Sequence, residues 1–218
     1  GAIRFASPPF REFPTRIEGD RMFADDGARL ALVPVEEHGI FSQAPFSEED
    51  PVSCPISPYA ATKRAGELML FTYSHLYALP VTCLRFFTVY GECGRPDMAV
   101  ARFTEFIAKG KPVPVYGDGT IKRDFTYVGD IVKGIVASIY TPFRYEIINL
   151  GGAHTTEVIR LVSIIEAKLG KKAEINLLPG KSWDVPITFA DVGKAGRLIG
   201  FEPVVSIEEG IERYVKWY

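Results

Sequence analysis

The sequence has few cysteines, no long apolar run and almost no net charge. Its 218 residues include three cysteines. Their number is odd, and they show no C-x-x-C or metal-ligand spacing. This favours free thiols in a reducing compartment. We therefore expect a cytoplasmic protein with no disulfide framework and no metal site. No apolar run approaches the length of a membrane span, so we expect no membrane partner. The formal net charge of −2 provides no basic surface field, which argues against a nucleic-acid partner.

The remaining composition is that of an ordinary globular protein, with 47% hydrophobic and 24% charged residues. Residues 1–41 follow no clear pattern, and only residues 28–35 (ARLALVPV) read as a possible strand. From residue 57 onward, strand patterns alternate with helix patterns. This alternation predicts an α/β architecture with mainly parallel strand pairing.

The helix and strand predictions rest on capping residues and apolar periodicity. Ser57 and Pro58 predict the start of a helix that runs to about residue 77. Asp130 is predicted to cap a later helix, and Ser206 opens a capping box with Glu209. The apolar stripe of the Asp130 helix comprises Ile131, Ile135, Val136 and Ile139. Further helices are expected at residues 98–109, 157–169 and 191–199, and strands at 81–87, 113–116, 123–128, 145–150 and 174–178.

The first helix carries Tyr59 and Lys63, which lie one turn apart on the same face. A phenol titrates near pH 10, and a nearby ammonium group favours the phenolate form. Such a pair could exchange a proton with a sugar hydroxyl while a cofactor takes up a hydride. The spacing alone is common, and a solvated helix face is the alternative interpretation.

Several further motifs give that helix a context. Residues 57–67 (SPYAATKRAGE) are followed by residues 84–91 (LRFFTVYG) and 94–99 (GRPDMA), and then by segments at 114–119, 123–128, 184–186, 190–191 and 210–211. In this order they resemble the extended short-chain dehydrogenases of the NAD-dependent epimerase/dehydratase family, over about residues 42–218. Within the family, FFTVYG followed by GRPDMA is most similar to the UDP-glucuronate 4-epimerases.

The resemblance implies an incomplete Rossmann-like parallel sheet with a smaller C-terminal α/β substrate-binding domain. Residues 1–41 match nothing, residues 42–93 would end the dinucleotide-binding domain, and residues 94–218 would mainly form the substrate domain, with some segments returning to the sheet. The implied reaction interconverts UDP-glucuronate and UDP-galacturonate by oxidation and reduction at C4 with NAD. A homodimer through the Tyr59 helix is also implied, with apolar contacts from Leu68, Met69, Phe71, Tyr73 and Leu76.

The resemblance also assigns roles near the reacting sugar. Tyr59 would be the catalytic acid/base, Lys63 would hold the nicotinamide ribose, and Phe86 would lie near the nicotinamide. Thr88 and Arg95 would lie by the sugar, where a guanidinium could bind the uronate carboxylate with two hydrogen bonds. The alternatives are that Arg95 is a surface residue and that Thr88 packs at a strand end.

Further residues would bind the nucleotide part of the substrate. Arg123 would meet the diphosphate, Asp184 the ribose, and the segment from Val113 to Tyr116 the uracil. Lys181 could add a second cation. The structural alternatives are an ion pair of Arg123 with Asp124 or Asp130, and a turn cap at Asp184.

The sequence departs from the family in two places. It contains no G-x-x-G-x-x-G, the glycine-rich turn that would hold the cofactor pyrophosphate. Residues 35–40 (VEEHGI) lack the catalytic serine or threonine that the family places before Tyr59. We therefore expect this chain alone to bind NAD poorly and to have little epimerase activity. Two other interpretations stay open: a non-catalytic fragment that binds sugar nucleotides, and a relative of the dTDP-sugar 4,6-dehydratases, suggested by Glu36 and Glu37.

Overall fold

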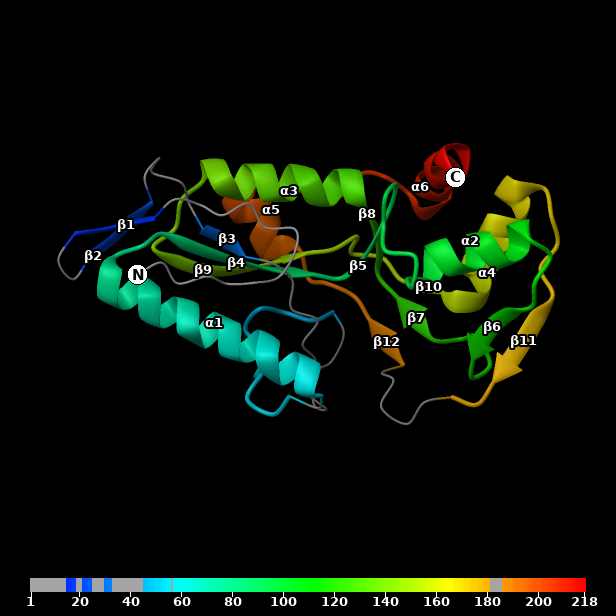
Figure 1. The fold of residues 1–218 in the computed structure, drawn as a ribbon, viewed down its shortest axis with the longest axis horizontal. Coiled ribbons are helices and arrows are strands. Elements are labelled where there is room, and N and C mark those ends of the chain that lie inside the picture. The colour runs from blue at the N-terminus through cyan, green and yellow to red at the C-terminus, as the bar shows by residue number, and fades with distance from the viewer. Residues whose placement is uncertain (1–14, 19–20, 25–29, 33–44, 56, 181–185) are drawn as a thin grey trace.

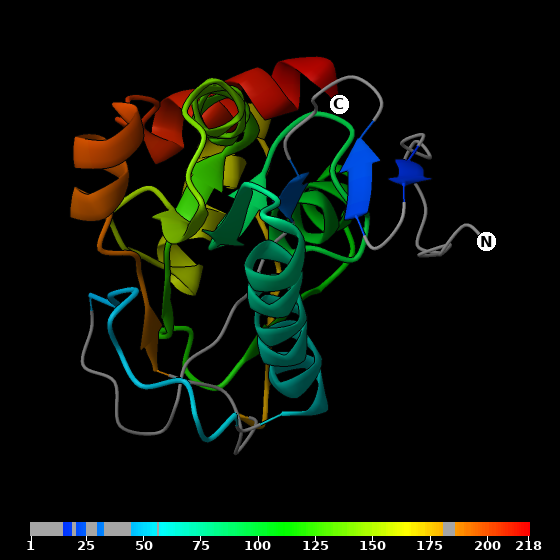
Figure 2. The same ribbon diagram turned by 90° about the vertical axis from the view of Figure 1, so that its left-hand side faces the viewer.

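The computed structural model describes residues 15–18, 21–24, 30–32, 45–55, 57–180 and 186–218, with side chains from residue 45 onward. One part of the fold is a parallel sheet in the order β3 (Leu30–Leu32), β4 (Val81–Phe86), β9 (Tyr145–Leu150). Helix α1 (Pro58–Tyr77) covers one face, and α3 (Val128–Tyr140) and α5 (Gly193–Ile199) cover the other (Figures 1 and 2). Helices on both faces are what a parallel sheet requires, and the α/β prediction is confirmed.

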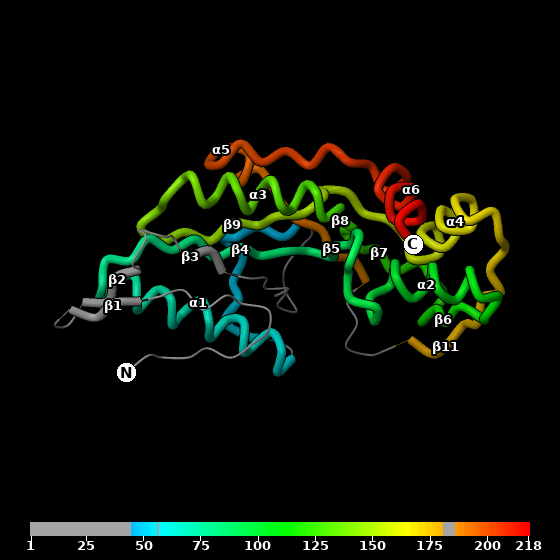
Figure 3. The backbone as a smooth tube through the Cα atoms, turned by 45° about the horizontal axis from the view of Figure 1, so that its top comes forward, coloured from blue at the N-terminus to red at the C-terminus, as the bar shows by residue number. Residues whose placement is uncertain are grey.

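The other end of the molecule holds a second group of elements (Figure 3). Strands β6 (Val113–Tyr116) and β11 (Ile175–Leu178) pair in parallel there, beside α2 (Ala99–Ala108), α4 (Val158–Leu169) and α6 (Ile207–Trp217). Short strands connect the two ends: β5 (Thr88–Tyr90) with β8 (Phe125–Tyr127), and the set β10 (Thr156–Glu157), β7 (Lys122–Arg123) and β12 (Ile187–Thr188). Strands β1 (Thr15–Glu18) and β2 (Arg21–Ala24) form an antiparallel pair.

Each end has its own hydrophobic core. At the sheet end, the buried residues of β4 and β9 pack with Ile131 of α3, Ala195 of α5 and Phe201. At the other end, β6 and the apolar faces of α2, α4 and α6 pack together around Val113 and Ile211. Full burial of one such aliphatic side chain stabilises the folded state by roughly 1.5–3 kcal/mol. The apolar faces of the helices therefore determine how the helices pack on the strands.

Two capping predictions are confirmed, that of Ser57 in full and that of Ser206 in part. The Ser57 side chain accepts a hydrogen bond from the Ala60 N–H at 3.0 Å and caps α1. The Ser206 side chain accepts one from the Glu209 N–H at 3.2 Å and caps α6. The return half of that capping box does not form, because the Glu209 carboxylate binds Arg213 instead.

The prediction that Asp130 caps a helix is wrong. Helix α3 begins at Val128 with Tyr127 as its N-cap, so Asp130 lies within the first turn. Its buried carboxylate accepts hydrogen bonds from the backbone of the segment that leads into α6. The predicted apolar stripe is also too wide, since Val136 and Ile139 are exposed. None of the helices in the described ranges has the length and apolarity needed to cross a membrane.

Candidate functional site

The direction of α1 determines where its first turn lies. Glu67, in the middle of the helix, contacts Arg85 near the carboxyl end of β4. Ser74, two turns later, donates a hydrogen bond to the carbonyl oxygen of Arg144, just before the amino end of β9. Helix α1 therefore runs antiparallel to β4 and β9. Its first turn lies at their carboxyl edge, which is where open α/β sheets bind ligands.

Tyr59 lies in that first turn, and Lys63 lies one turn further on the same face. The Lys63 ammonium lies 5.2 Å from the centroid of the Tyr59 ring. The Tyr59 side chain is 51% exposed, and Lys63 is half-buried. Both side chains are therefore accessible at the helix end, whose dipole favours negative charge such as a phenolate.

A buried ion pair holds α1 against the sheet. The Arg85 guanidinium donates to both Glu67 carboxylate oxygens, at 2.8 and 2.9 Å. The two side chains are 5% and 2% exposed, and Arg64 adds a third hydrogen bond to Glu67 at 2.8 Å. Since Glu67 lies on the helical face that carries Lys63, this pair fixes the rotation of that face. Sequence analysis missed it, although Glu67 continues the four-residue spacing of Tyr59 and Lys63.

Phe86 and Thr88 continue the same edge. Phe86 ends β4 and is paired with Leu150, the last residue of β9. Its half-buried ring packs against the core of the sheet end. Thr88 begins β5, is half-buried, and donates its backbone N–H to the Asp124 carbonyl oxygen at 3.0 Å. The edge of the sheet thus continues directly into the strands β7 and β8.

Asp124 connects three segments at this point, residues 124–126, 152–153 and 190, and was not predicted as a site residue. Its fully buried carboxylate accepts hydrogen bonds from Thr126 at 2.9 Å, from the backbone of Gly152 at 2.6 Å and Ala153 at 3.2 Å, and from that of Ala190 at 3.0 Å. Burial raises the pKa of Asp124, while the four hydrogen bonds oppose this. The carboxylate is therefore a structural anchor and is not open to a ligand.

Arg123 precedes this anchor in the middle strand of the β10–β7–β12 set. Thr156 and Thr188 are its two backbone neighbours. The guanidinium is half-buried and donates to the Lys122 carbonyl oxygen at 2.8 Å. The carboxylates of Asp124 and Asp130, the suggested alternative partners of Arg123, are each engaged by other donors.

The predicted uracil-contacting strand lies at the other end of the molecule. Val113 of β6 is fully buried in the core, so any ligand contact there would involve its backbone. Tyr116, at the end of the same strand, is half-buried. Strand β6 pairs with β11, whose end leads toward residues 181–185. The predicted substrate residues Lys181 and Asp184 lie outside the described residues, as do Glu36 and Glu37.

Arg95 lies on a short loop between β5 and α2. Its guanidinium forms two hydrogen bonds to the Asp97 carboxylate, at 3.1 and 2.9 Å, and one to the Met98 sulfur at 3.5 Å. The Arg95 and Asp97 side chains are 73% and 66% exposed. Arg95 is thus a surface residue whose guanidinium is presented to solvent.

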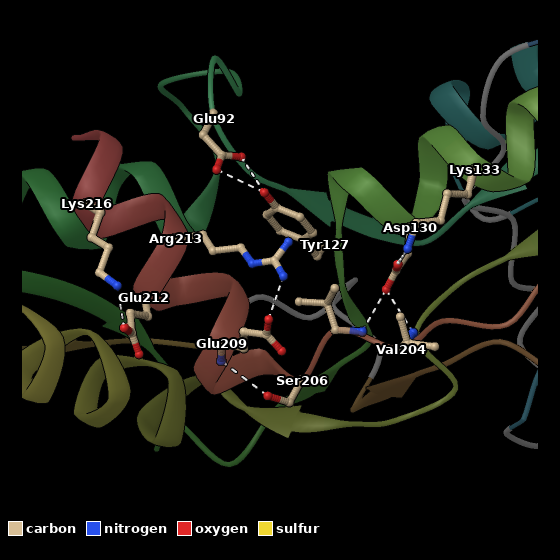
Figure 4. A network of polar contacts seen from close by, with 11 residues as sticks. Glu92, Tyr127, Asp130, Lys133, Val204, Ser206, Glu209, Glu212, Arg213 and Lys216 are labelled. Atoms are coloured by element: carbon tan, nitrogen blue, oxygen red, sulfur yellow. Dashed lines mark hydrogen bonds and ion pairs between the residues drawn. The ribbon is translucent and has the colours of Figure 1, made fainter.

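A hydrogen bond from Tyr127 holds the start of this loop. The phenol contacts both Glu92 carboxylate oxygens at 2.9 Å, and the Arg213 guanidinium of α6 lies 5.2 Å from its ring centroid (Figure 4). Burial, and then the Glu92 carboxylate, raise the pKa of Tyr127, so the phenol remains the donor. At the loop's first residue, Gly91 has φ +156° and a side chain would meet Val128. The loop is therefore held against β8 and the start of α3.

Four of the predicted residues lie on elements that begin or end at the carboxyl edge of the sheet. Tyr59 and Lys63 come from α1, Phe86 ends β4, and Thr88 is paired with Phe125 of β8, two residues beyond Arg123. The arrangement offers a phenol and an ammonium group beside strand ends that lead to an arginine.

Comparison with known proteins identifies the family. The family model for the NAD dependent epimerase/dehydratase family matches residues 33–151, just over half of the chain. The chain belongs to this family. Its parallel strands and flanking helices agree with the Rossmann-like structures of other members.

Relatives of this epimerase/dehydratase chain include several named UDP-glucuronate 4-epimerases. That of Thermodesulfobacterium geofontis is 48% identical over 174 residues, covering 79% of this chain and 54% of the relative. A probable UDP-glucuronate 4-epimerase of Rhizobium meliloti is 41% identical, and the match covers 83% of this chain and 59% of the relative. The chain thus spans somewhat more than half the length of these relatives.

Solved structures give the same result. The UDP-glucuronic acid 4-epimerase of Bacillus cereus in complex with UDP-glucuronic acid and NAD is 35% identical, with a TM-score of 0.80 over 86% of this chain and 60% of that one. A dTDP-glucose 4,6-dehydratase of Bacillus anthracis in complex with NAD is 26% identical, with a TM-score of 0.77 over 87% of this chain and 61% of that one. Both belong to the kinds of enzyme considered from the sequence.

Proposed function

We propose that this chain carries the catalytic helix and the sugar-nucleotide site of a UDP-glucuronate 4-epimerase. The observation that supports this most is that α1 begins, with Tyr59 and Lys63, toward the carboxyl edge of β4 and β9, the edge from which β5 and Thr88 continue. The choice of UDP-glucuronate as the substrate rests on the names of the relatives described above.

In the proposed reaction Tyr59 removes the proton from the sugar C4 hydroxyl and later returns it. The Lys63 ammonium favours the phenolate that this requires and holds the cofactor ribose. NAD, when bound, would supply the acceptor of the C4 hydride, and the hydride must return to the opposite face of the sugar for the configuration to invert. Thr88 and Arg95 orient the uronic acid, and Arg123 and Lys181 bind the diphosphate, with Asp184 on the ribose and the segment from Val113 to Tyr116 by the uracil.

The residues of the chain fit NAD only in part. Tyr59 and Lys63 at the start of α1, and Phe86 at the end of β4, are the residues that would meet the nicotinamide ribose. The 218 residues contain no glycine-rich turn for the pyrophosphate. We therefore expect weak NAD binding and slow turnover by this chain, and we assign residues 42–93 to the end of the cofactor domain and 94–218 mainly to the substrate domain.

The test is incubation of the purified chain with UDP-glucuronate and NAD, followed by chromatographic separation of UDP-glucuronate from UDP-galacturonate. Conversion that falls about 10²-fold or more in the Tyr59→Phe variant supports the proposal, since loss of a general acid/base has that magnitude. Conversion that is unchanged in Tyr59→Phe would refute the assigned role. Failure to bind either UDP-sugar would refute the function as a whole.

A second function, binding of UDP-sugars without turnover, is favoured by the lack of a serine or threonine at residues 35–40. Calorimetric titration with UDP-glucuronate separates the two functions, because saturable binding without product supports only the second. Stoichiometric, tight binding of NAD would contradict our interpretation of the cofactor site.

We also propose that the chain forms a homodimer through α1. Four apolar side chains of this helix are at least half exposed: Leu68, Met69, Phe71 and Leu76. Exposed apolar patches on a helix are typical of interfaces. Light scattering should give the mass of a dimer for the native chain and of a monomer for Met69→Glu; a native monomer at micromolar concentration would contradict this.

A further inference from the structure

Among the hydrogen bonds seen in the described part of the chain, two arginines each meet a carboxylate with two hydrogen bonds, and these pairs differ in burial. Arg85 and Glu67 are almost completely buried. Arg95 and Asp97 have comparable geometry, but both side chains are mostly in water. A buried pair cannot be broken without a large cost, whereas an exposed pair exchanges its partners readily. Arg95 can therefore release Asp97 for another carboxylate.

The loop presents this pair in a fixed way. Residues 95–98 form a turn in which the Met98 N–H donates to the Arg95 carbonyl oxygen at 3.2 Å. Pro96 stands at the second position of the turn, where its fixed φ suits the backbone. Upstream, the Gly94 N–H donates to the Gly91 carbonyl oxygen at 3.1 Å, and a side chain at Gly94 would come within 2.9 Å of that oxygen.

The same loop is tied to the rest of the protein by Glu92, whose two carboxylate oxygens share the single O–H donor of Tyr127 (Figure 4). Because the backbone is held at Glu92 and again at the start of α2, a change in the charge at position 97 should act on Arg95 without moving the loop. The other nearby cation is Arg102, one turn into α2, whose N–H donates to the Met98 carbonyl oxygen and whose charge also acts on Asp97.

We propose that Asp97 is a specificity-determining counter-ion that competes with the carboxylate of an acidic sugar substrate for the Arg95 guanidinium. This inference rests on the proposed function and extends it to a residue that does not itself contact the substrate. Asp97 occupies the Nε and Nη2 donors of Arg95, one of the edges that can bind a carboxylate with two hydrogen bonds, and its negative charge opposes a second carboxylate on the same guanidinium. A neutral sugar such as glucose has no carboxylate that competes for Arg95, so its binding does not depend on Asp97.

The variant Asp97→Asn tests the inference. It keeps an oxygen that can accept a hydrogen bond from Arg95, but it removes the charge. We expect the dissociation constant of UDP-glucuronate to fall about three- to fivefold, the range of exposed ion pairs, and that of UDP-glucose to stay unchanged. The effect should shrink in high salt, because exposed charges are screened.

Glu105→Gln is the matched control. Glu105 forms an exposed pair with Lys109 on α2, so its replacement removes the same charge from the same region without touching Arg95. Calorimetric titration of the native chain and both variants with UDP-glucuronate and UDP-glucose gives the required ratios. We expect the ratio of the two affinities to change only in Asp97→Asn.

Each other result contradicts the inference in a distinguishable way. Equal tightening of both sugars, or equal effects of Asp97→Asn and Glu105→Gln, would show a general charge effect. Unchanged or weaker UDP-glucuronate binding in Asp97→Asn would show that Asp97 does not compete. If neither sugar binds the native chain, the proposed function is refuted, and this inference is refuted with it.

Discussion

The buried pair of Glu67 and Arg85 allows the most stringent test of how α1 is held. Replacing Glu67 by alanine leaves a guanidinium that is 5% exposed without the carboxylate that receives two of its hydrogen bonds. Removing one partner of a buried ion pair costs about 3–5 kcal/mol. A domain has about 5–15 kcal/mol of stability in total, so Glu67→Ala should be close to unfolding.

Replacing both partners should have a much smaller effect. In the double variant Glu67→Met, Arg85→Met no charge is left buried, and the two unbranched side chains fill similar space. Such replacements are often neutral or stabilising. We therefore expect the double variant to be at least about 2 kcal/mol more stable than Glu67→Ala.

Urea unfolding, followed by circular dichroism, measures these differences from the midpoint at constant slope. Asp97→Ala is the control, because it breaks an arginine–carboxylate pair of similar geometry that is exposed. Its midpoint should stay close to that of the native chain. The reasoning would be refuted if Glu67→Ala were as stable as Asp97→Ala, or if the double variant were less stable than the single one.

Two further predictions concern buried polar groups in the core. Burial raises the pKa of Asp130, but hydrogen bonds from Val205, Lys133 and Val204 outweigh it, so the folded pKa is lowered. The stabilisation is therefore complete above the unfolded pKa near about 4 and is lost as the pH falls through the lower folded pKa. The difference in urea midpoint between the native chain and Asp130→Asn should stay constant above about pH 5 and shrink below about pH 4, and a difference that does not shrink there would contradict this. The buried Tyr90 hydroxyl has no hydrogen-bond partner among the described residues, so Tyr90→Phe should unfold at equal or higher urea concentration, and a loss of more than about 1 kcal/mol would contradict this.

Much of the local structure could be predicted from the sequence because the signals are local. Ser57 with Pro58, and Ser206 with Glu209, start their helices within a few residues of the pattern that predicts them. Gly170 and Gly200 end α4 and α5 in the left-handed conformation that glycine favours. The order of strands and helices followed from the same signals.

The errors came from partners far away in the sequence. Asp130 looked like a cap, but its carboxylate binds Val204, which lies 74 residues further along the chain. Glu67 meets Arg85 at a separation of 18 residues, and Asp124 meets Ala190 at 66. Local periodicity cannot indicate such pairs, since the choice of partner depends on how the elements pack.

The candidate site contains two kinds of side chain, buried ones that hold the elements in place and exposed ones that would contact a ligand. Glu67, Arg85 and Asp124 are buried and engaged by several hydrogen bonds, so they determine where the strands and α1 lie. Tyr59 and Arg95, the groups that would meet a sugar, are more than half exposed and can change partners. Substitutions of the first kind should therefore alter unfolding before binding, and substitutions of the second kind binding alone. A binding site built in this way keeps its geometry while its exposed groups exchange one counter-ion for another.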